Sequence, residues 1–281
     1  MQQAEILILA VIYNTHAETL RYLKSIETVA PGNIALVLAD NSDREVPVGF
    51  VEKTAGCPFV TYLKTGKNLG YFGGAREAFN CYQASHAALP RWILVTNVDI
   101  VFTPGFFLQL AALPDSPGLG MVAPAILSER WHADYNPKIS QRYSRKKLHF
   151  YLFLYSSFLI HNAFLAAAYL KRWINGRMSG PPAEGMPEPR PAERIYAPHG
   201  SCLVFHRNYF ERGGTIDLPN FLFGEEVLVA ETARQLNLDV MYHPEMIIRD
   251  YEHASTGFFI SPRINRYNRE AIRSILERYY C

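Results

Sequence analysis

Short apolar runs alternate with segments of helical periodicity along the N-terminal part of the chain. The apolar runs are rich in Ile, Leu and Val, have the length of β-strands, and cover residues 5–14, 33–43, 59–66 and 91–102. A continuous apolar character is typical of strands that are buried on both faces. The segments 16–30 and 73–89 place apolar residues at helical spacing. This order predicts an α/β fold with a mostly parallel central sheet flanked by helices.

Polar residues follow three of the predicted strands at the point where each strand ends. They are Asn14, Asp40 with Asn41, and Asn97 with Asp99. Burial of the Asp99 carboxylate in its apolar run would be costly without a partner. Turn chemistry explains each polar residue taken singly. Because parallel strands bring their carboxyl ends to one edge, where open α/β sheets bind ligands, the residues together predict a single cleft.

A glycine-rich segment, residues 67–79, leads from the third strand into the second helix. Its glycines, Gly70, Gly73 and Gly74, do not have the spacing of the G-x-G-x-x-G dinucleotide motif, and Asn68 stands where a P-loop carries Ser or Thr. Backbone amides at a helix N-terminus can face a diphosphate, although glycines also simply permit tight turns. The segment is therefore a candidate anion-binding loop.

The composition restricts the class of protein. With 281 residues, of which 49% are hydrophobic and 19% charged, the chain can bury a full core in one large domain or two small ones. A net charge of +2 argues against general nucleic-acid binding. The four cysteines are scattered, which favours reduced thiols in a cytoplasmic protein over a zinc site or disulfides. The N-terminus lacks a basic region before its apolar run, so we expect no signal peptide.

Residues 142–177 form an apolar, aromatic stretch with Lys and Arg on both sides. Three interpretations are open: a transmembrane helix, a buried pair of core helices, and a helix or hairpin in the membrane interface. His161 and Asn162 disfavour a span, and a single span would also place the two halves of the domain on opposite sides of the membrane. Aromatic residues and basic flanks favour the interface and its anionic headgroups. The Pro- and Gly-rich residues 179–194 are then expected to form a mobile connector.

The C-terminal part carries a second set of candidate residues. His199 and Gly200 precede an apolar run at residues 202–205. Glu225 and Glu226 open a predicted helix after an aromatic-rich segment. Acidic residues at a helix N-terminus have a simple explanation in the helix dipole, but two adjacent carboxylates are also placed to supply a general base.

Seven blocks along the chain resemble the family 2 glycosyltransferases with the GT-A fold, in particular the bacterial rhamnosyltransferase-like members. The blocks read VIYN, LADNSD, KNLGYFGGAREAF, LVTNVDIVF, HGSCLVFHRNYFERGG, FLFGEE and YEHASTG. Each block is degenerate, but seven in the right order make a specific signal. The resemblance implies one GT-A domain over residues 1–281, with a nucleotide-sugar-binding half (1–127), an inserted helical segment with a Pro-rich connector (128–194), and an acceptor and catalytic-base half (195–281).

The resemblance assigns donor-binding roles to individual residues. Asp40 matches the acidic residue that contacts the nucleoside, and Asn68 matches the family's N-x-G segment beside the donor together with Gly70, Gly73 and Gly74. The other residues that we group with the nucleotide-sugar site are Asn14, Asn41, Asn97, His199 and Gly200.

The resemblance also implies a metal site and a catalytic base. Asp99 matches the metal ligand of the family's D-x-D motif, here in its N-x-D form, and His253 matches a histidine that often completes the site. Oxygen ligands suit Mg²⁺ or Mn²⁺, and a histidine shifts the choice toward Mn²⁺. Glu226 matches the catalytic base, but it replaces the usual Asp, so Glu225 is a rival, and Leu228 stands where an acidic residue often follows.

The implied reaction moves a sugar from a nucleoside-diphosphate sugar to a saccharide or lipid-linked saccharide, with inversion, as in surface-polysaccharide (O-antigen or capsule) synthesis. One base without a covalent nucleophile implies a single displacement. A sugar-nucleotide nucleotidyltransferase is disfavoured, because it would carry a basic, Gly-rich loop where this chain reads YNTHAE. A non-catalytic nucleotide-sugar-binding or scaffold protein on a degenerate transferase fold is the remaining alternative. The expected location is the cytoplasm, with peripheral contact through residues 142–177 at the inner face of the plasma membrane.

Overall fold

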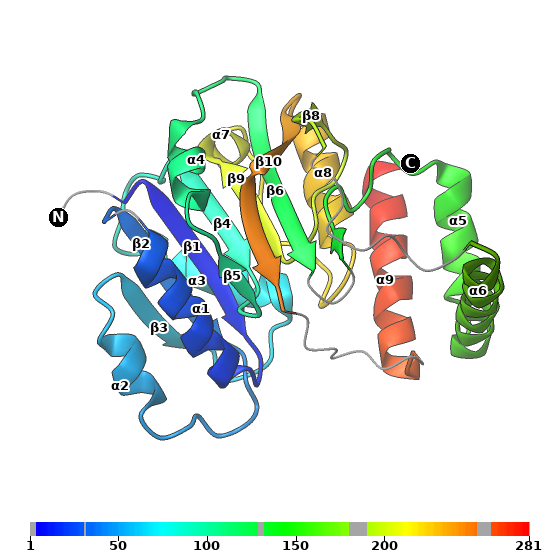
Figure 1. Ribbon diagram of the computed structural model, residues 1–281, viewed down its shortest axis with the longest axis horizontal. Coiled ribbons are helices and arrows are strands. Elements are labelled where there is room, and N and C mark those ends of the chain that lie inside the picture. Colours follow the sequence, from blue (N-terminus) through cyan, green and yellow to red (C-terminus); the bar gives the residue numbers. More distant parts are fainter. Residues whose placement is uncertain (1–3, 31, 129–131, 180–189, 252–259, 281) are drawn as a thin grey trace.

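A central sheet with helices on both faces forms the body of the molecule (Figure 1). The computed structural model describes residues 4–30, 32–128, 132–179, 190–251 and 260–280, with side chains beyond residue 171 of the 132–179 segment left aside. The main path of the sheet has the order β3-β2-β1-β4-β9-β6-β10-β5. Its strands are β1 (Ile6–Ile12), β2 (Ile34–Asp40), β3 (Val60–Lys64), β4 (Trp92–Thr96), β5 (Ile100–Phe102), β6 (Leu119–Ser128), β9 (Cys202–His206) and β10 (Asp239–Asp250). Two short strands, β7 (Ala133–Asp134) and β8 (Glu193–Arg194), pair with β6 and β10.

The sheet is mixed: antiparallel pairs occur at β4–β9, β9–β6 and β10–β5 along its main path. Strands β3, β2, β1 and β4 are parallel, as the alternating pattern of the N-terminal part predicts. Strand β9 then runs antiparallel to both β4 and β6, while β10 is parallel to β6. The mixed sheet with its flanking helices is the α/β architecture expected from the sequence.

Alternate residues of each strand supply the cores on the two faces of the sheet. One face packs on α1 (His16–Val29) and α4 (Phe106–Ala112), with residues such as Ile6 and Ile8 of β1. The other face packs on α3 (Tyr71–Gln83), α7 (Arg207–Glu211) and α8 (Glu225–Gln235), with Leu7 and Leu9 of β1. Both faces of β1 are buried, which explains why its sequence is continuously apolar rather than alternating. The short α2 (Phe50–Ala55) lies beside β3.

The C-terminal helix α9 (Pro262–Tyr279) connects this body to a helical pair, α5 (Arg145–Leu154) and α6 (Phe158–Ser179) (Figure 1). A third apolar cluster joins Leu148 of α5 to Leu228 of α8 and Ile275 of α9. Within the described part of the chain no single helix is long and apolar enough to cross a membrane. The α5–α6 pair, bent by 108°, passes on length and composition only when its two helices are taken together.

Three sequence expectations need correction or lie outside the described residues. The run 91–102 is not one strand: it divides into β4 and β5, and β5 pairs with β10 at the far end of the sheet path. Gly73 and Gly74 are not loop residues, because α3 already begins at Tyr71. An added Cβ on Gly74 would lie 2.8 Å from the Asn41 side chain, so this glycine permits close packing of helix and strand. Most of the connector expected at 179–194 lies outside the described residues.

Candidate active site

The residues predicted to follow the strands gather at the carboxyl edge of the parallel half of the sheet. Asn14 follows β1, Asp40 ends β2, and Asn97 follows β4. The backbone amide of Asn41 donates to the Ile12 carbonyl at 2.9 Å, which ties the ends of β1 and β2 together. The cleft edge expected from the sequence is therefore built from neighbouring strands.

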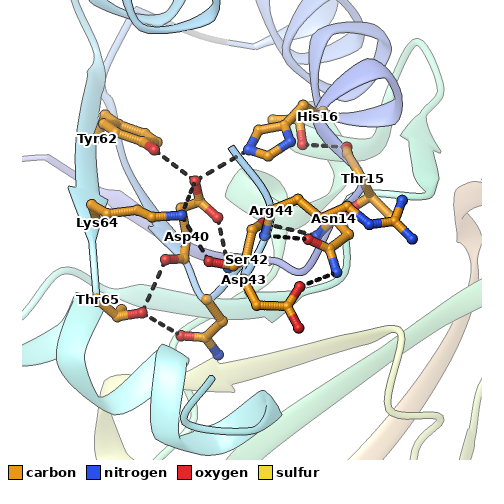
Figure 2. A network of polar contacts seen from close by, with 12 residues as sticks. Asn14, Thr15, His16, Asp40, Ser42, Asp43, Arg44, Tyr62, Lys64 and Thr65 are labelled. Atoms are coloured by element: carbon orange, nitrogen blue, oxygen red, sulfur yellow. Dashed lines mark hydrogen bonds and ion pairs between the residues drawn. The ribbon is translucent and has the colours of Figure 1, made fainter. Parts of the chain in front are cut away.

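Asp40 is the centre of a buried polar network at this edge, as Figure 2 shows. Its Oδ2 accepts hydrogen bonds from the Tyr62 hydroxyl at 2.6 Å and from Lys64 Nζ at 3.2 Å, and lies 3.2 Å from Nε2 of His16. Its Oδ1 accepts the Ser42 backbone amide at 2.9 Å. Burial acts to raise the pKa of Asp40, but hydrogen bonds from Ser42, Tyr62 and His16 outweigh it and hold the pKa well below its usual range. Asp40 is thus a fixed anion.

Asn14 holds the adjoining loops together rather than pointing toward Asp40 (Figure 2). It adopts a left-handed backbone conformation with φ of 59°, which Asn tolerates better than most residues. Its side-chain Nδ2 donates to Asp43 at 2.7 Å, and its backbone amide donates to Ser42 Oγ at 2.8 Å. Asn14 therefore shapes the rim of the site around Asp40.

Asn41 and Asn68 fix the glycine-rich loop. The Asn41 side chain accepts from Thr65 Oγ1 at 2.9 Å and donates to the Gly70 carbonyl at 2.8 Å. Asn68 Oδ1 accepts the Gly70 amide at 2.9 Å. Gly70 has a φ of +77°, and a Cβ added there would lie 2.1 Å from the Phe221 carbonyl oxygen. Glycine is required because the loop passes directly against the segment that leads into α8.

Asp99 lies in the short connection between β4 and β5, directly before β5 begins. Asp99 as a whole is half-buried, but its carboxylate oxygen Oδ1 is fully buried. Its carbonyl accepts the backbone amide of Tyr251 at 3.1 Å, immediately after β10. Nearby, the backbone amide of Asn97 donates to the Ser201 carbonyl at 3.0 Å. His253, the second predicted metal ligand, lies outside the described residues.

Glu225 and Glu226 begin α8, as the sequence predicts. The preceding residues, Phe223 and Gly224, both have positive φ angles, 70° and 80°. A Cβ on Gly224 would lie 3.1 Å from Ala271 of α9, so α9 supports the turn that presents the two carboxylates. A left-handed non-glycine residue stores backbone strain of the kind found at functional sites.

Tyr71 and Gly200 connect the acidic pair to the Asp99 side of the site. The Tyr71 hydroxyl donates to the Gly200 carbonyl at 2.8 Å, and a Cβ on Gly200 would lie 3.2 Å from Glu226 Oε1. Burial raises the pKa of Tyr71 well above its usual value, and nearby ionisable groups, Cys202 first among them, act in the same direction. Gly200 therefore joins Tyr71 to Glu226, and the next residue, Ser201, accepts the backbone amide of Asn97 on the Asp99 side.

The two glutamates have different electrostatic environments. Burial, followed by the charge of Glu226, raises the pKa of Glu225, and the cation of Lys138 acts in the opposite direction. The protonated form of Glu225 is therefore favoured beside Glu226.

His199 is held as a neutral imidazole. Burial, assisted by the nearby charge of Lys138, lowers its pKa to about 3. The Ser201 backbone amide donates to Nδ1 at 3.2 Å, so the ring proton is assigned to Nε2. The His199 amide donates to the side chain of Asn136 at 2.8 Å, and Tyr135 stacks on the ring. His199 is thereby bound to residues 135–138 rather than to the Asp40 network.

Asp99 is the predicted metal ligand that lies among the described residues. The described residues contain no group of three or more His, Cys, Asp or Glu side chains that could hold a metal by themselves. Mg²⁺ in proteins keeps waters and phosphate oxygens and needs only one or two carboxylates. Asp99, with its buried Oδ1, suits that role.

Sequence reasoning missed several residues of the site. Tyr71, Asn136, Lys138 and Phe221 reach it from three different segments of the chain. Tyr71 could have been noted, because it directly follows Gly70 in the candidate anion-binding loop. The other three carry no motif, and only the folded chain brings them to the site.

The fold is of the GT-A type, because the chain superimposes on solved structures of that fold. The model of the family described as Glycosyl transferase family 2 matches residues 8–175, more than half of the chain. The chain belongs to this family, which confirms the resemblance seen in the sequence.

Curated relatives of the chain include the N-acetylglucosaminyl-diphospho-decaprenol L-rhamnosyltransferases of two strains of Mycobacterium tuberculosis. Each is 24% identical over 260 residues, which cover 89% of this chain and 77% of the relative. The similarity thus extends across most of both proteins.

Two solved structures share the fold at low sequence identity. The crystal structure of GalNAc-T7 with UDP, GalNAc and Mn²⁺ aligns with a TM-score of 0.56 and 13% identity, over 89% of this chain but only 44% of that one. The mannosyltransferase PcManGT from Pyrobaculum calidifontis, in complex with GDP-Man and Mn²⁺, aligns with a TM-score of 0.51 and 12% identity, over 99% of this chain and 74% of its own. The chain spans less than half the length of the GalNAc-T7 chain, and the likeness is one of fold.

Proposed function

We propose that this protein is an inverting glycosyltransferase that moves a sugar from a nucleoside-diphosphate sugar to a saccharide carried on a lipid. Membership of glycosyl transferase family 2 supports the transfer of a sugar. The curated relatives, whose name includes an N-acetylglucosaminyl-diphospho-decaprenol acceptor and an L-rhamnosyl group, support a lipid-linked acceptor and a role in polysaccharide synthesis. The structural neighbours bound to UDP or GDP-Man support a nucleotide-sugar donor.

The donor half of the proposed site lies at the carboxyl edge of β1, β2 and β4. Asp40 is an ionised, buried acceptor suited to the hydroxyl and N–H groups of a nucleoside. The diphosphate is assigned to the N-terminal end of α3, which follows the Asn68–Gly70 loop, because backbone amides at a helix N-terminus can bind an anion. Asp99, together with His253, would hold Mn²⁺ or Mg²⁺, and such a cation, when bound, would stabilise negative charge on the diphosphate.

Glu226 is the proposed general base. Its carboxylate takes the proton of the acceptor hydroxyl while the hydroxyl oxygen forms a bond to the anomeric carbon. The bond from that carbon to the diphosphate oxygen breaks, and its electron pair leaves with the nucleoside diphosphate. One displacement inverts the configuration. Glu225, which holds its proton, is placed to donate a hydrogen bond beside the base.

The observation that carries the proposal is the position of Tyr71 between the two halves. Its hydroxyl donates to the Gly200 carbonyl, and Gly200 abuts Glu226; the next residue, Ser201, accepts the backbone amide of Asn97, two residues before Asp99. A diphosphate near Asp99 and an acceptor hydroxyl near Glu226 would therefore be close enough for direct transfer.

Steady-state kinetics of carboxamide variants test the base. We expect Glu226→Gln to lower kcat by about 10²- to 10⁴-fold, the usual contribution of general base catalysis, with little change in donor affinity. Glu245→Gln is the control: it removes an exposed carboxylate from β10, and we expect kcat to stay at the parental value. If Glu225→Gln is the inactive variant and Glu226→Gln is active, the assignment of the base is wrong.

A thermal-shift screen of nucleoside diphosphates and nucleotide sugars, with and without Mn²⁺, tests the transferase against a non-catalytic binding protein. A ligand stabilises the folded state by RT ln(1 + [L]/Kd), so the correct nucleotide should raise Tm most. We expect Asp99→Ala to lose the Mn²⁺-dependent part of the shift and remain folded. If a nucleotide sugar binds but is neither hydrolysed nor used for transfer with any divalent cation added, the enzymatic proposal is contradicted.

A further inference from the structure

The outer faces of α5 and α6 form an exposed apolar surface, here called the α5–α6 surface. Of the twelve large hydrophobic side chains that are exposed among the described residues, eight lie on these two helices, so the exposure is concentrated rather than scattered. They include Phe150, Phe153, Leu159, Phe164 and Leu170, and Phe153 and Leu159 are 63% and 65% exposed. The rings of Phe150 and Phe164 lie 6.2 Å apart and join the two helices into one face. A gathered apolar face of this kind marks an interaction site.

The segment that carries this surface is strongly basic. Residues 135–183 contain eight Lys and Arg residues and no Asp or Glu. Because the whole chain carries a net charge of +2, the rest of the chain carries −6. Arg145, Lys146 and Lys147, at the start of α5, are all exposed. The excess of positive over negative charge thus lies in the segment that exposes its apolar side chains.

This distribution of charge decides between the two occupants that an apolar face most often has. A symmetric dimer through this surface would bring two copies of the same +8 segment together, and like charges oppose such an interface. An anionic bilayer is complementary to the charge, and aromatic and aliphatic side chains beside Lys and Arg are suited to its interface. The fold also permits contact of this surface with a bilayer, because two polar residues of α6 point away from the apolar face. His161 hydrogen-bonds to the Asn265 side chain, and Asn162 donates to the Ile260 carbonyl.

A cavity of about 300 Å³ lies at the base of this surface, between the turn that joins α5 to α6 and the N-terminal half of α9. Arg266 and Arg269 line it from α9, and Ser156 and Ser157 line it from the turn. The turn is fixed from below, because the buried Asn265 donates to the Tyr155 carbonyl at 2.9 Å. Two guanidinium groups and two hydroxyls on a fixed frame match the chemistry of a phosphate.

Arg269 is the residue that most favours an anionic ligand in this cavity. Its Nε is buried and has no hydrogen-bond partner among the described residues. A buried donor of a charged group is costly when it is left unsatisfied. A phosphate oxygen in the cavity would supply the acceptor. Phe158 lines the same cavity and belongs to the α5–α6 surface, so the cavity opens where the apolar surface begins.

We propose that the α5–α6 surface rests on an anionic lipid bilayer and that the cavity lined by Arg266 and Arg269 binds the phosphate of the lipid-linked acceptor. Helix α9 relates this cavity to the base: one side carries Arg266 and Arg269, and the other carries Ala271, which contacts the turn at Gly224. The two sites are separated by roughly the 10 Å width of a helix. The identity of the phosphate as the acceptor's rests on the proposed function, whereas membrane binding does not.

Vesicle sedimentation tests the docking surface without any enzymatic readout. The full chain is mixed with vesicles of phosphatidylcholine alone or with 30% phosphatidylglycerol, a charge content chosen to give an anionic surface of about −30 mV or more. We expect binding to the anionic vesicles that weakens in high salt, and a loss of at least about 10-fold in the double variant Phe153→Ser/Leu159→Ser. Leu108→Ser, which removes a 69% exposed side chain on α4, is the matched control and should bind as the parent does.

Two outcomes would overturn the docking proposal. Equal loss in the Leu108→Ser control would show that binding is not specific to the α5–α6 surface. A concentration-dependent dimer that dissociates in the Phe153→Ser/Leu159→Ser variant, with no vesicle binding, would show that a second copy occupies the surface.

Binding of farnesyl diphosphate, measured by calorimetry in metal-free buffer, tests the cavity, with inorganic pyrophosphate and farnesol as comparison ligands. We expect Arg266→Gln and Arg269→Gln each to weaken farnesyl diphosphate binding by about 10-fold, the effect of losing one charge-assisted hydrogen bond. Arg278→Gln, on the same helix outside the cavity, and Asp99→Ala, in the donor half, should leave it unchanged. Circular dichroism checks that each variant is folded, and Arg266 is exposed enough to be replaced without disturbing the core.

The possible results separate the two proposals. Equal affinity for pyrophosphate and farnesyl diphosphate would identify a free-phosphate site and contradict a lipid ligand. Loss of binding in Asp99→Ala but not in the two arginine variants would place the diphosphate in the donor half and overturn the cavity proposal. Absence of sugar transfer with intact binding at the cavity would instead contradict the proposed function alone.

Discussion

The carboxylate of Glu226 lies against Gly200, with its Oε1 only 3.2 Å from the point where a side chain at position 200 would begin. Gly200 also receives the Tyr71 hydroxyl on its carbonyl oxygen at 2.8 Å. A glycine at this position therefore leaves room for the proposed base, and its carbonyl links the base to Tyr71.

We predict that Gly200→Ala lowers kcat by up to about 10-fold, because the added Cβ, 3.2 Å from Glu226 Oε1, displaces the proposed base slightly from its position in the reaction. The donor KM should change little, since the Asp40 network is remote from the substitution. Gly32→Ala is the control, because an added Cβ there meets no atom within 4 Å. Unchanged kcat in Gly200→Ala would argue against Glu226 as the base.

The raised pKa of Glu225 predicts a pH dependence of stability. Below the pKa of an ordinary Glu, about 4.3, both folded and unfolded chains hold this proton and its stabilising effect is complete. As pH rises through the raised pKa of the folded protein, the unfolded chain has already lost the proton and the effect is lost. The free energy of unfolding should therefore fall over this window by about 1.4 kcal/mol for each unit of pKa difference.

Urea denaturation at a series of pH values measures this effect. Glu225→Gln should flatten the decline and be the more stable protein at neutral and alkaline pH, while the exposed Glu52→Gln should follow the parent. Parallel profiles for the parent and Glu225→Gln would show that burial of Glu225 has no such consequence.

The Asp40 network predicts the opposite sign. The lowered pKa of Asp40 contributes stability that is present above the ordinary carboxyl pKa and is lost as pH falls. Asp40→Asn should lower the free energy of unfolding at pH 7 by about 1.5–3 kcal/mol, the value of a hydrogen bond to a charged group. The difference from the parent should shrink in acid, and nucleoside-diphosphate binding should weaken. A variant with parental stability at pH 7 would contradict this prediction, and the exposed Glu45→Gln serves as control.

The contact of Gly70 with Phe221 predicts a matched pair of glycine variants. Gly70 and Gly66 have nearly the same positive φ, +77° and +76°, so alanine is strained at both positions, and the ψ of 179° at Gly70 lies in a region that essentially only glycine adopts. Only at Gly70 does the new Cβ collide with a backbone atom, the Phe221 carbonyl at 2.1 Å. Gly70→Ala should therefore be the less stable variant in urea denaturation and should also lose transfer activity. Equal stability of the two variants would mean that the loop moves away from Phe221 without cost.

Much of the fold follows from local pattern. The apolar runs at 5–14 and 33–43 became β1 and β2, and the helical segment 16–30 became α1, because a strand buried on both faces has no polar position to interrupt it. The acidic pair at the start of α8 was also predictable, since a helix N-terminus favours negative charge.

Other features were decided by distant segments. In the run 91–102 the polar residues Asn97 and Asp99 suggest the end of a strand, but nothing local indicates that residues 100–102 form a second strand. Pairing of β5 with β10 determines that break. The aromatic stretch 142–177 has the composition of either a core or an interfacial helix. Packing against α9 buries Leu148 and His161 and leaves Phe153 and Leu159 exposed.

The sequence by itself determined the type of the sheet and the chemical groups that end its strands, because strand periodicity and turn chemistry act over a few neighbouring residues. The tertiary structure alone decided which groups face one another: Tyr71 with Gly200, Gly200 with Glu226, and Gly70 with Phe221. These contacts join segments up to 151 positions apart along the chain, and only the packing of α3, α8 and α9 around the sheet brings them within a few ångströms.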